Sequence, residues 1–198
     1  MSVTVVDCGA SNTASMLFAL DRLGVRALLT ADPAAIAEAE RIILPGVGHA
    51  AYVMQRLASR GLVDPLRTFP RPLFGVCLGM QLLFSETAEG EAACLGLIPG
   101  RVVALAGTPE LPVPHMGWNS LDFVPGHPLL DGVAPGAHVY FVHRYAVPPG
   151  AHSLATADYG GAFTAVAGCG NRLGAQFHPE RSGPVGARIL RNFLELQC

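Results

Sequence analysis

Residues 71–84, Arg-Pro-Leu-Phe-Gly-Val-Cys-Leu-Gly-Met-Gln-Leu-Leu-Phe, decide how this chain folds. The apolar run at 73–76 predicts a buried strand, and apolar residues at helical spacing over 80–84 predict a helix directly after it. Cys77 lies at the turn between the two. This order of strand, turn and helix predicts a nucleophile elbow, with the pattern G-x-C-x-G in place of G-x-S-x-G.

The two glycines that flank the cysteine suit such a turn. A strained residue crowds the positions two before and two after it, and only residues without a Cβ, such as Gly75 and Gly79, fit there. The thiol of Cys77 would also stand at a helix N-terminus, where unpaired N–H groups and the helix dipole favour a thiolate. Free cysteine is nevertheless often a small core residue, so this motif alone leaves a structural and a nucleophilic role equally open.

Composition limits the class of protein. The chain has 198 residues, is 51% hydrophobic and carries a formal net charge of −2; we expect one domain spanning 1–198. All thirteen basic residues are arginines, and their scatter argues against a nucleic-acid-binding surface. No apolar run approaches the ~20 residues needed to cross a membrane, and residues 1–7 predict a strand, not a signal peptide. We therefore expect a cytoplasmic protein without membrane association.

The cysteines and histidines show no metal-binding pattern. Five cysteines are an odd number without a C-x-x-C pair, which argues against a disulfide framework or a zinc ribbon. Apart from His178, the histidines show no i, i+4 pair or other ligand spacing. We expect no catalytic metal and no cofactor.

The first 85 residues alternate between predicted strands and helices. Strands are predicted at 3–7, 25–29, 41–44 and 73–76. The helices between them begin after a cap at Ser11 or Asn12, at the Asp-Pro pair 32–33 and near residue 50. This alternation produces a parallel sheet with helices on both faces.

Residues 90–177 have a different character, rich in Gly and Pro. Short strand-like runs occur at 102–105, 113–116, 139–147, 163–167 and 173–177. We expect mixed or antiparallel strands added to the parallel core, and a last helix at 185–196. The predicted fold class is α/β, a central, mostly parallel sheet flanked by helices.

The loop Pro45-Gly46-Val47-Gly48 follows the third strand, where open α/β sheets bind ligands. With residues 49–51 it fits the dinucleotide pattern G-x-G-x-x-A, which would make the chain a nucleotide-binding module. That fingerprint belongs in the first βα turn, where this chain has Asp-Cys-Gly-Ala at 7–10. An oxyanion hole suits the loop better, since its N–H groups and that of Leu78 could hold a developing negative charge.

A cysteine nucleophile needs a base and a group that orients the base. His178 stands in Gln-Phe-His-Pro-Glu at 176–180, just past a predicted strand. Pro179 biases His178 toward an extended backbone, in which residues two apart point to the same side, so Glu180 can reach the imidazole. The other ring nitrogen would then face the thiol. Taken alone, the triplet fits an exposed turn equally well.

Three motifs together resemble the triad class (class I) of glutamine amidotransferases: Pro-Gly-Val-Gly at 45–48, Gly-Val-Cys-Leu-Gly-Met-Gln at 75–81 and Gln-Phe-His-Pro-Glu at 176–180. Further segments resemble the glutaminase-subunit family of imidazole glycerol phosphate synthase, an enzyme of histidine biosynthesis. These segments are 95–100, 114–119, 140–143 and 178–182. The resemblance runs over essentially the whole chain and implies a flavodoxin-like fold.

The resemblance also implies roles for individual residues. Cys77 would attack the side-chain amide of L-glutamine, while His178, oriented by Glu180, moves the proton. Water would then hydrolyse the glutamyl thioester. The oxyanion hole would comprise N–H groups of Gly46, Val47, Gly48 and Leu78. The glutamine contacts would comprise Gly79, Gln81, His143, Arg144 and Tyr145.

The resemblance further implies a partner. Ammonia would pass to a TIM-barrel cyclase subunit in a heterodimer that makes imidazole glycerol phosphate and AICAR. Trp118, Asn12 and Arg181 would lie at the interface, although Trp118 fits a partly buried core position as well. Stimulation by a partner would involve the oxyanion loop, in which Gly46 and Gly48 permit a peptide flip.

The chain departs from the family pattern at four places: residues 8–11, His49, Arg144 and Arg181. We expect these positions at the rim of the active site. They therefore affect the expected partner fit and glutamine affinity and leave the expected reaction unchanged. A glutaminase serving another synthase, for example one making pyridoxal phosphate, is a third interpretation. The segment Pro-His-Met-Gly-Trp-Asn at 114–119 argues against it.

Overall fold

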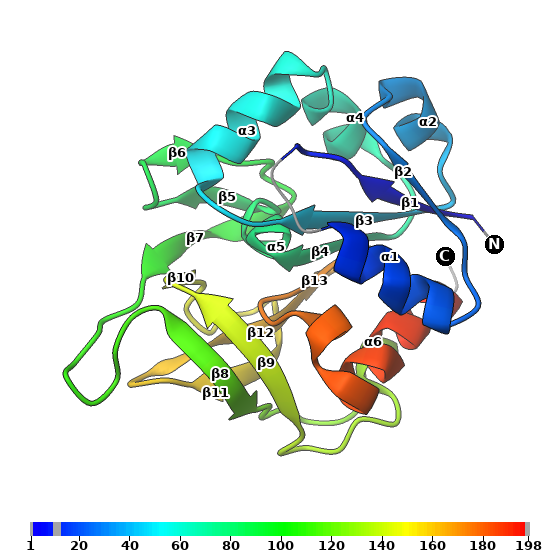
Figure 1. Ribbon diagram of the computed structural model, residues 1–198. Helices are drawn as coiled ribbons and strands as arrows, with labels where there is room; N and C mark the ends of the chain where they lie inside the picture. Colours follow the sequence, from blue (N-terminus) through cyan, green and yellow to red (C-terminus); the bar gives the residue numbers. More distant parts are fainter. Residues whose placement is uncertain (1, 10–12, 197–198) are drawn as a thin grey trace.

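A seven-stranded sheet runs through the centre of the computed structural model, which describes residues 2–9 and 13–196 (Figure 1). Its strands are β1 (Val3–Val6), β2 (Ala27–Thr30), β3 (Arg41–Gly46), β4 (Leu73–Cys77), β11 (Ser153–Asp158), β12 (Ala162–Cys169) and β13 (Arg172–Ala175). Their order is β11-β12-β13-β4-β3-β1-β2. The five strands from β13 to β2 are parallel, whereas β12 is antiparallel to β13 and to β11. The predicted α/β class with a mostly parallel sheet is confirmed.

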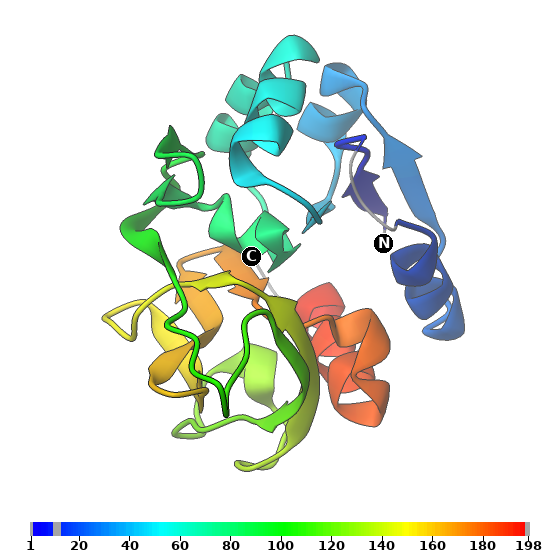
Figure 2. The ribbon, with the colours of Figure 1, turned by 60° about the vertical axis from the view of Figure 1, so that its left-hand side comes forward.

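Helices cover both faces of this sheet. Figures 1 and 2 place α2 (Pro33–Glu38), α3 (Ala50–Ser59) and α4 (Val63–Thr68) on one side, and α1 (Thr13–Arg22) and α6 (Gly183–Glu195) on the other. Each side has its own apolar core, with Leu57 in the first and Phe193 in the second. Strand β4 is buried along its whole length because it is covered on both faces.

The helix starts agree with the sequence where they are described. The Asp32 side chain accepts a hydrogen bond from the N–H of Ala34 at 3.0 Å, and Pro33 is the first residue of α2, as predicted. The expected cap of α1 at Ser11 or Asn12 lies outside the described residues. Within the described ranges, no helix combines the length and apolar character needed to cross a bilayer.

The second half adds two smaller sheets and two 3-10 turns. Strands β5 (Phe84–Thr87), β6 (Ala92–Ala93), β7 (Ile98–Ala104) and β10 (Tyr145–Ala146) form one sheet, and β8 (His115–Ser120) and β9 (His138–His143) form an antiparallel pair. The turns are η1 (Pro128–Leu130) and η2 (Pro179–Arg181). Antiparallel strands in this half are as predicted; β5, β6, β11 and helix α4 were not predicted.

The predicted helix through residue 84 is wrong. Helix α5 (Leu78–Gln81) is a single turn, and Phe84 begins β5. The carbonyl of Leu83 accepts hydrogen bonds from the N–H groups of Leu97 and Ile98, which brings the chain alongside β7. All side chains from 78 to 84 are buried, so their spacing marks no helical face, and a short apolar run is ambiguous between helix and strand.

Candidate active site

The backbone at Cys77 is strained in the way an elbow requires. Cys77 ends β4 with φ 54° and ψ −114°, a conformation that non-glycine residues rarely adopt. A Cβ on Gly79 would lie 1.8 Å from the Leu44 carbonyl oxygen, and one on Gly75 would lie 2.6 Å from the carbonyl carbon of Gly79. Both glycines are therefore needed for the close approach of β3, β4 and α5, as the sequence predicts.

A cavity of about 280 Å³, the first cavity, opens beside Cys77. It is lined by Val47, Gly48, Cys77, Leu78, Gln81, Glu89, Pro114, Val142, His143, Arg144, Tyr145 and His178. The structure thus brings together at one place most residues predicted for the triad, the oxyanion hole and the glutamine contacts. Gly79 is an exception: it is buried against Leu44 and is not among the residues that line the cavity, so its contact with glutamine stays a prediction.

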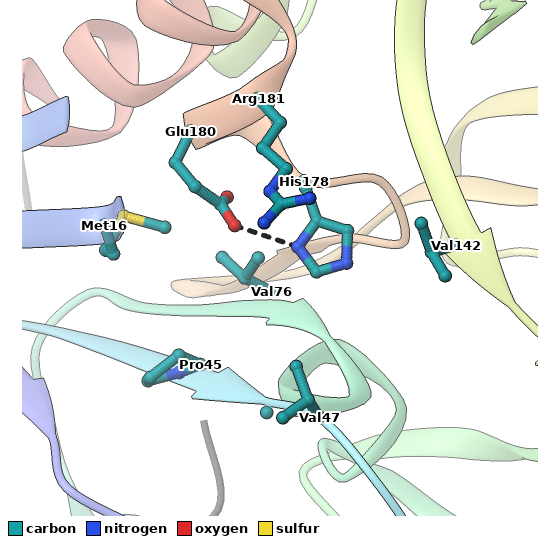
Figure 3. Close-up of a pocket in the computed structure, with 9 residues that line it drawn as sticks. Met16, Pro45, Val47, Val76, Val142, His178, Glu180 and Arg181 are labelled. Carbon is teal, nitrogen blue, oxygen red and sulfur yellow. Dashed lines mark hydrogen bonds and ion pairs between the residues drawn. The ribbon is translucent and has the colours of Figure 1, made fainter. Parts of the chain in front are cut away.

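His178 and Glu180 form a largely buried pair next to the thiol. Nδ1 of His178 lies 2.9 Å from Oε1 of Glu180, and the two side chains are 13% and 7% exposed (Figure 3). The predicted contact is confirmed, and the exposed-turn alternative is wrong. The local backbone differs from the extended segment expected, because Glu180 lies in the 3-10 turn η2.

Strand β9 and Ser182, the residue before α6, hold this pair in place. The N–H of His178 donates to the Tyr140 carbonyl at 2.9 Å. The hydroxyl of Ser182 accepts from the N–H of Tyr140 at 2.9 Å and donates to the His178 carbonyl at 2.7 Å. Sequence reasoning missed Ser182, although it stands in the His-Pro-Glu-Arg-Ser segment 178–182.

The surroundings of His178 favour its charged form. Burial lowers the pKa of the imidazole, but hydrogen bonds and charge interactions with Cys77 and Glu180 outweigh burial and raise it to about 10. At neutral pH the ring is therefore an imidazolium. An imidazolium between a sulfur and a carboxylate is poised to give a proton to a leaving group.

The predicted oxyanion loop lies directly against the elbow. Gly46 pairs with Cys77 across β3 and β4, and a Cβ on Gly46 would lie 2.7 Å from the N atom of Gly79. Gly48 has φ +93°, which favours glycine. Gly48 and Leu78 both line the first cavity, whereas Gly46 lines an adjacent, second cavity.

Glu89 is a cavity residue that sequence reasoning missed. Its Oε2 accepts a hydrogen bond at 2.7 Å from the N–H of Ala50, the first residue of α3. The N-terminus of that helix, where a dinucleotide phosphate would bind, thus already holds a carboxylate. A second anion there would be repelled, so the geometry disfavours the dinucleotide interpretation of residues 46–51.

A second cavity of about 190 Å³ lies beyond His178 (Figure 3). It is lined by Met16, Pro45, Gly46, Val47, Val76, Val142, His178, Glu180 and Arg181. Val47, Val142 and His178 line both cavities and thus form the boundary between them. Across the residues that the structure describes, no three His, Cys, Asp or Glu side chains gather in a group that could hold a metal ion.

The predicted interface residues are only partly described. Trp118 lies on β8, is 56% exposed and packs edge-on against Tyr140 at 6.0 Å between ring centroids. A core position for Trp118 is therefore wrong. Met116, on the same strand, is also exposed; Arg181 is exposed beside the second cavity. Asn12 lies outside the described residues.

A cysteine elbow facing a His–Glu pair on a doubly wound sheet defines a class of protein. The family model for class-I glutamine amidotransferases matches residues 4–196, and the chain belongs to this family. Within it, the chain is 53% identical over 196 residues to the imidazole glycerol phosphate synthase subunit HisH of Xylella fastidiosa (strain Temecula1), covering 99% of this chain and 98% of that protein. It is 52% identical over 194 residues to the same subunit of Xanthomonas axonopodis pv. citri, covering 98% and 97%.

Solved structures agree on the fold. A crystal structure described as a glutamine amidotransferase has a TM-score of 0.77 at 22% identity and covers 98% of this chain and 97% of its own. A putative GMP synthase subunit from Thermoplasma acidophilum has a TM-score of 0.74 at 18% identity, covering 98% and 92%. At such identities these structures support the shared fold alone.

Proposed function

We propose that this chain is the glutaminase subunit of an imidazole glycerol phosphate synthase in histidine biosynthesis. It hydrolyses L-glutamine to glutamate and passes the ammonia to a TIM-barrel cyclase subunit. One observation carries the proposal: Cys77 and the His178–Glu180 pair meet at one cavity, in a chain 53% identical to a HisH subunit.

The first half-reaction uses the ion pair around His178. The sulfur of Cys77 attacks the amide carbon of glutamine, and the developing oxyanion is stabilised by N–H groups of Leu78 and the loop 46–48. The imidazolium of His178 gives its proton to the amide nitrogen as the C–N bond breaks. Ammonia leaves, and a glutamyl thioester remains on Cys77.

The second half-reaction restores the enzyme. Neutral His178 takes a proton from water, which attacks the thioester carbon, and the C–S bond breaks to release glutamate. The carboxylate of Glu180 keeps a proton on Nδ1 of His178 throughout, so that Nε2 faces the reacting atoms.

Charges at the first cavity suit an amino acid. Glu89 lines it with a carboxylate, and Arg144 is exposed at its rim. We assign Glu89 to the α-ammonium group and Arg144 to the α-carboxylate of glutamine, because charge-assisted hydrogen bonds are the strong ones. His143 and Tyr145 line the same cavity and complete the binding site.

The cyclase would dock on the face that carries Met116, Trp118 and Arg181. Exposed aromatic and arginine side chains are enriched at protein interfaces. Met116 and Trp118 lie on β8, which pairs with β9. The Tyr140 carbonyl of β9 accepts a hydrogen bond from the N–H of His178. We propose that the chain works as a single domain in the cytoplasm. The thiols of Cys77, Cys94 and Cys169 fit a reducing compartment.

The test measures glutamate formation from glutamine by the chain alone, and then with the cyclase partner and its ribotide ligand. We expect weak activity alone, strong stimulation in the complex, and loss of both in Cys77→Ala. Turnover that survives in Cys77→Ala would overturn the nucleophile. Full activity without any response to the cyclase would point to another synthase.

A further inference from the structure

Two buried glutamine side chains lie next to the thiol of Cys77. Gln81 is 4% exposed and Gln176 is fully buried. The Nε2 group of Gln81 donates to the Tyr145 carbonyl at 2.8 Å and to Oε1 of Gln176 at 2.9 Å. A backbone carbonyl only accepts hydrogen bonds, so this contact fixes which end of the Gln81 amide is the nitrogen.

The orientation of Gln176 follows from that of Gln81. Its Oε1 receives an N–H of Gln81, so its Nε2 is the end that faces Cys77, at 3.8 Å from Sγ. A flipped Gln176 amide would set N–H against N–H at Gln81 and an oxygen against the sulfur. Both ends of the side chain therefore enforce the same orientation.

The Tyr145 carbonyl extends this network to β8. It also accepts a hydrogen bond from Nδ1 of His143 at 2.9 Å, and Nε2 of His143 lies 3.0 Å from Nδ1 of His115. With Nδ1–H of His143 donating, its Nε2 must accept from His115. Burial lowers the pKa of each imidazole to about 4, so both rings are neutral and these directions hold at neutral pH.

A backbone carbonyl also lies near the sulfur of Cys77. The Val142 carbonyl oxygen lies 3.6 Å from Sγ and accepts a hydrogen bond from the neutral thiol. It offers nothing to a thiolate, which needs donors. Two side-chain donors reach the charged sulfur: Nε2 of Gln176 and the imidazolium of His178.

We propose that Gln176 is a catalytic hydrogen-bond donor that stabilises the Cys77 thiolate, and that Gln81 is the positioning residue that keeps the Gln176 amide from turning. This inference rests on the proposed function, in which Cys77 is the nucleophile. The thiolate exists before attack on glutamine and again when the thioester breaks, so the contact acts in both half-reactions. Gln81 keeps only its Oε1 for substrate, because both of its N–H groups are used inside the protein.

The variants Gln176→Met and Gln176→Glu test the donor. Methionine matches glutamine in length and removes both polar atoms, whereas glutamate keeps an acceptor for Gln81 and loses the donor. The other ionisable groups around the sulfur stay in both variants: Glu89, His143, Arg144, Tyr145 and His178, with Glu180 behind His178. The change in Gln176→Met therefore reports the loss of the amide, and Gln176→Glu combines that loss with an added negative charge.

The measurement is the rate of alkylation of Cys77 by iodoacetamide from pH 5 to 9, followed by mass spectrometry of the Cys77 peptide. In Gln176→Met we expect an about tenfold lower rate at pH 7 and an alkylation profile moved to higher pH by roughly one unit, equal to the loss of one charge-assisted hydrogen bond. The alkylation rate at pH 7 should fall further in Gln176→Glu, because this variant adds a negative charge beside the sulfur. In the cyclase complex, kcat should fall while the KM for glutamine stays unchanged.

Asn192→Leu is the matched control. Asn192 is another buried amide, which donates to the Leu129 and Asp131 carbonyls on the far side of the core. It should lower the melting temperature and leave the alkylation profile of Cys77 unchanged. If Gln176 had a merely structural role, Gln176→Met would likewise lower the melting temperature and leave the alkylation profile of Cys77 unchanged.

Two outcomes overturn the inference. One is a folded Gln176→Met with a wild-type alkylation profile. If Gln176→Met does not unfold cooperatively, Gln81→Met is tested instead. The second outcome is a wild-type alkylation profile in Gln81→Met. Alkylation needs no turnover, so absence of glutaminase activity in the wild-type complex would overturn the proposed function separately from this inference.

Discussion

Gly186 lies against the backbone of Pro179 so closely that a Cβ on Gly186 would be 2.0 Å from the Pro179 carbonyl oxygen. Helix α6 thereby sets the position of the turn that carries Glu180. The contact is with backbone, which has little freedom to move away. Packing of a helix against a turn thus decides where Glu180, the hydrogen-bond partner of His178, is placed.

Gly186→Ala should displace Pro179 and with it the His178–Glu180 pair. We expect a loss of about 1–3 kcal/mol in the free energy of unfolding, as for other overpacked sites, and a clear fall in kcat. Gly150→Ala is the control, since a Cβ there would meet nothing within 4 Å. Denaturant unfolding and glutaminase assays check both, and wild-type values for Gly186→Ala would contradict the expectation.

Ser182→Ala should loosen the other side of the same turn. The hydroxyl makes hydrogen bonds to the N–H of Tyr140 and the carbonyl of His178, and leaving a buried N–H unsatisfied costs about 1–3 kcal/mol. We expect lower stability and lower kcat with little change in KM, measured by denaturant unfolding and steady-state kinetics. Ser59→Ala is the matched control, because Ser59 is exposed and its hydroxyl donates within its own helix, to the Arg56 carbonyl.

Much of this site is local in sequence and could be predicted for that reason. The elbow needs Cys77 between two glycines, and Glu180 reaches His178 across a single residue, so short motifs contain both. The parallel core was also predictable, because its strands in the first half of the chain alternate with helices.

The parts that could not be predicted depend on contacts between distant segments. Phe84 enters a strand because Leu83 meets residues 97 and 98, and nothing between 80 and 84 signals that partner. Glu89 reaches the first cavity by binding the start of α3, thirty-nine positions away. Gln176 stands next to the sulfur only after β13 pairs with β4. The Gln-Phe-His-Pro-Glu segment contains this residue but gives no sign of its contact.

Glu180→Gln tests the charge on His178. The ordinary pKa of 6.5 is raised to about 10 in the folded chain, so the paired imidazolium stabilises the fold fully below about pH 6.5, and this stability is lost as pH rises through 10. Without the carboxylate the pKa of His178 should fall, the loss of stability should begin at lower pH, and kcat should drop by roughly 10² or more.

NMR titration of His178 and unfolding at several pH values measure these changes. Glu195→Gln, an exposed change at the end of α6, is the control and should leave the titration of His178 unaltered. An imidazole that titrates identically in Glu180→Gln and wild type would remove Glu180 from the triad.

Glu89→Gln tests the assignment of the α-ammonium site. The amide oxygen of the new side chain still accepts from Ala50, so the start of α3 keeps its hydrogen bond, while the negative charge in the cavity is lost. We expect the KM for glutamine to rise about tenfold, the worth of one hydrogen bond to a charged group, with a smaller change in kcat.

Glutaramate, which is glutamine without its α-amino group, supplies the second measurement: wild type should strongly prefer glutamine, and Glu89→Gln should lose most of that preference. Glu91→Gln changes a nearby carboxylate that is paired with Arg101 at the surface and should keep both properties of the wild type. Equal discrimination by Glu89→Gln and wild type would move the ammonium site elsewhere in the cavity.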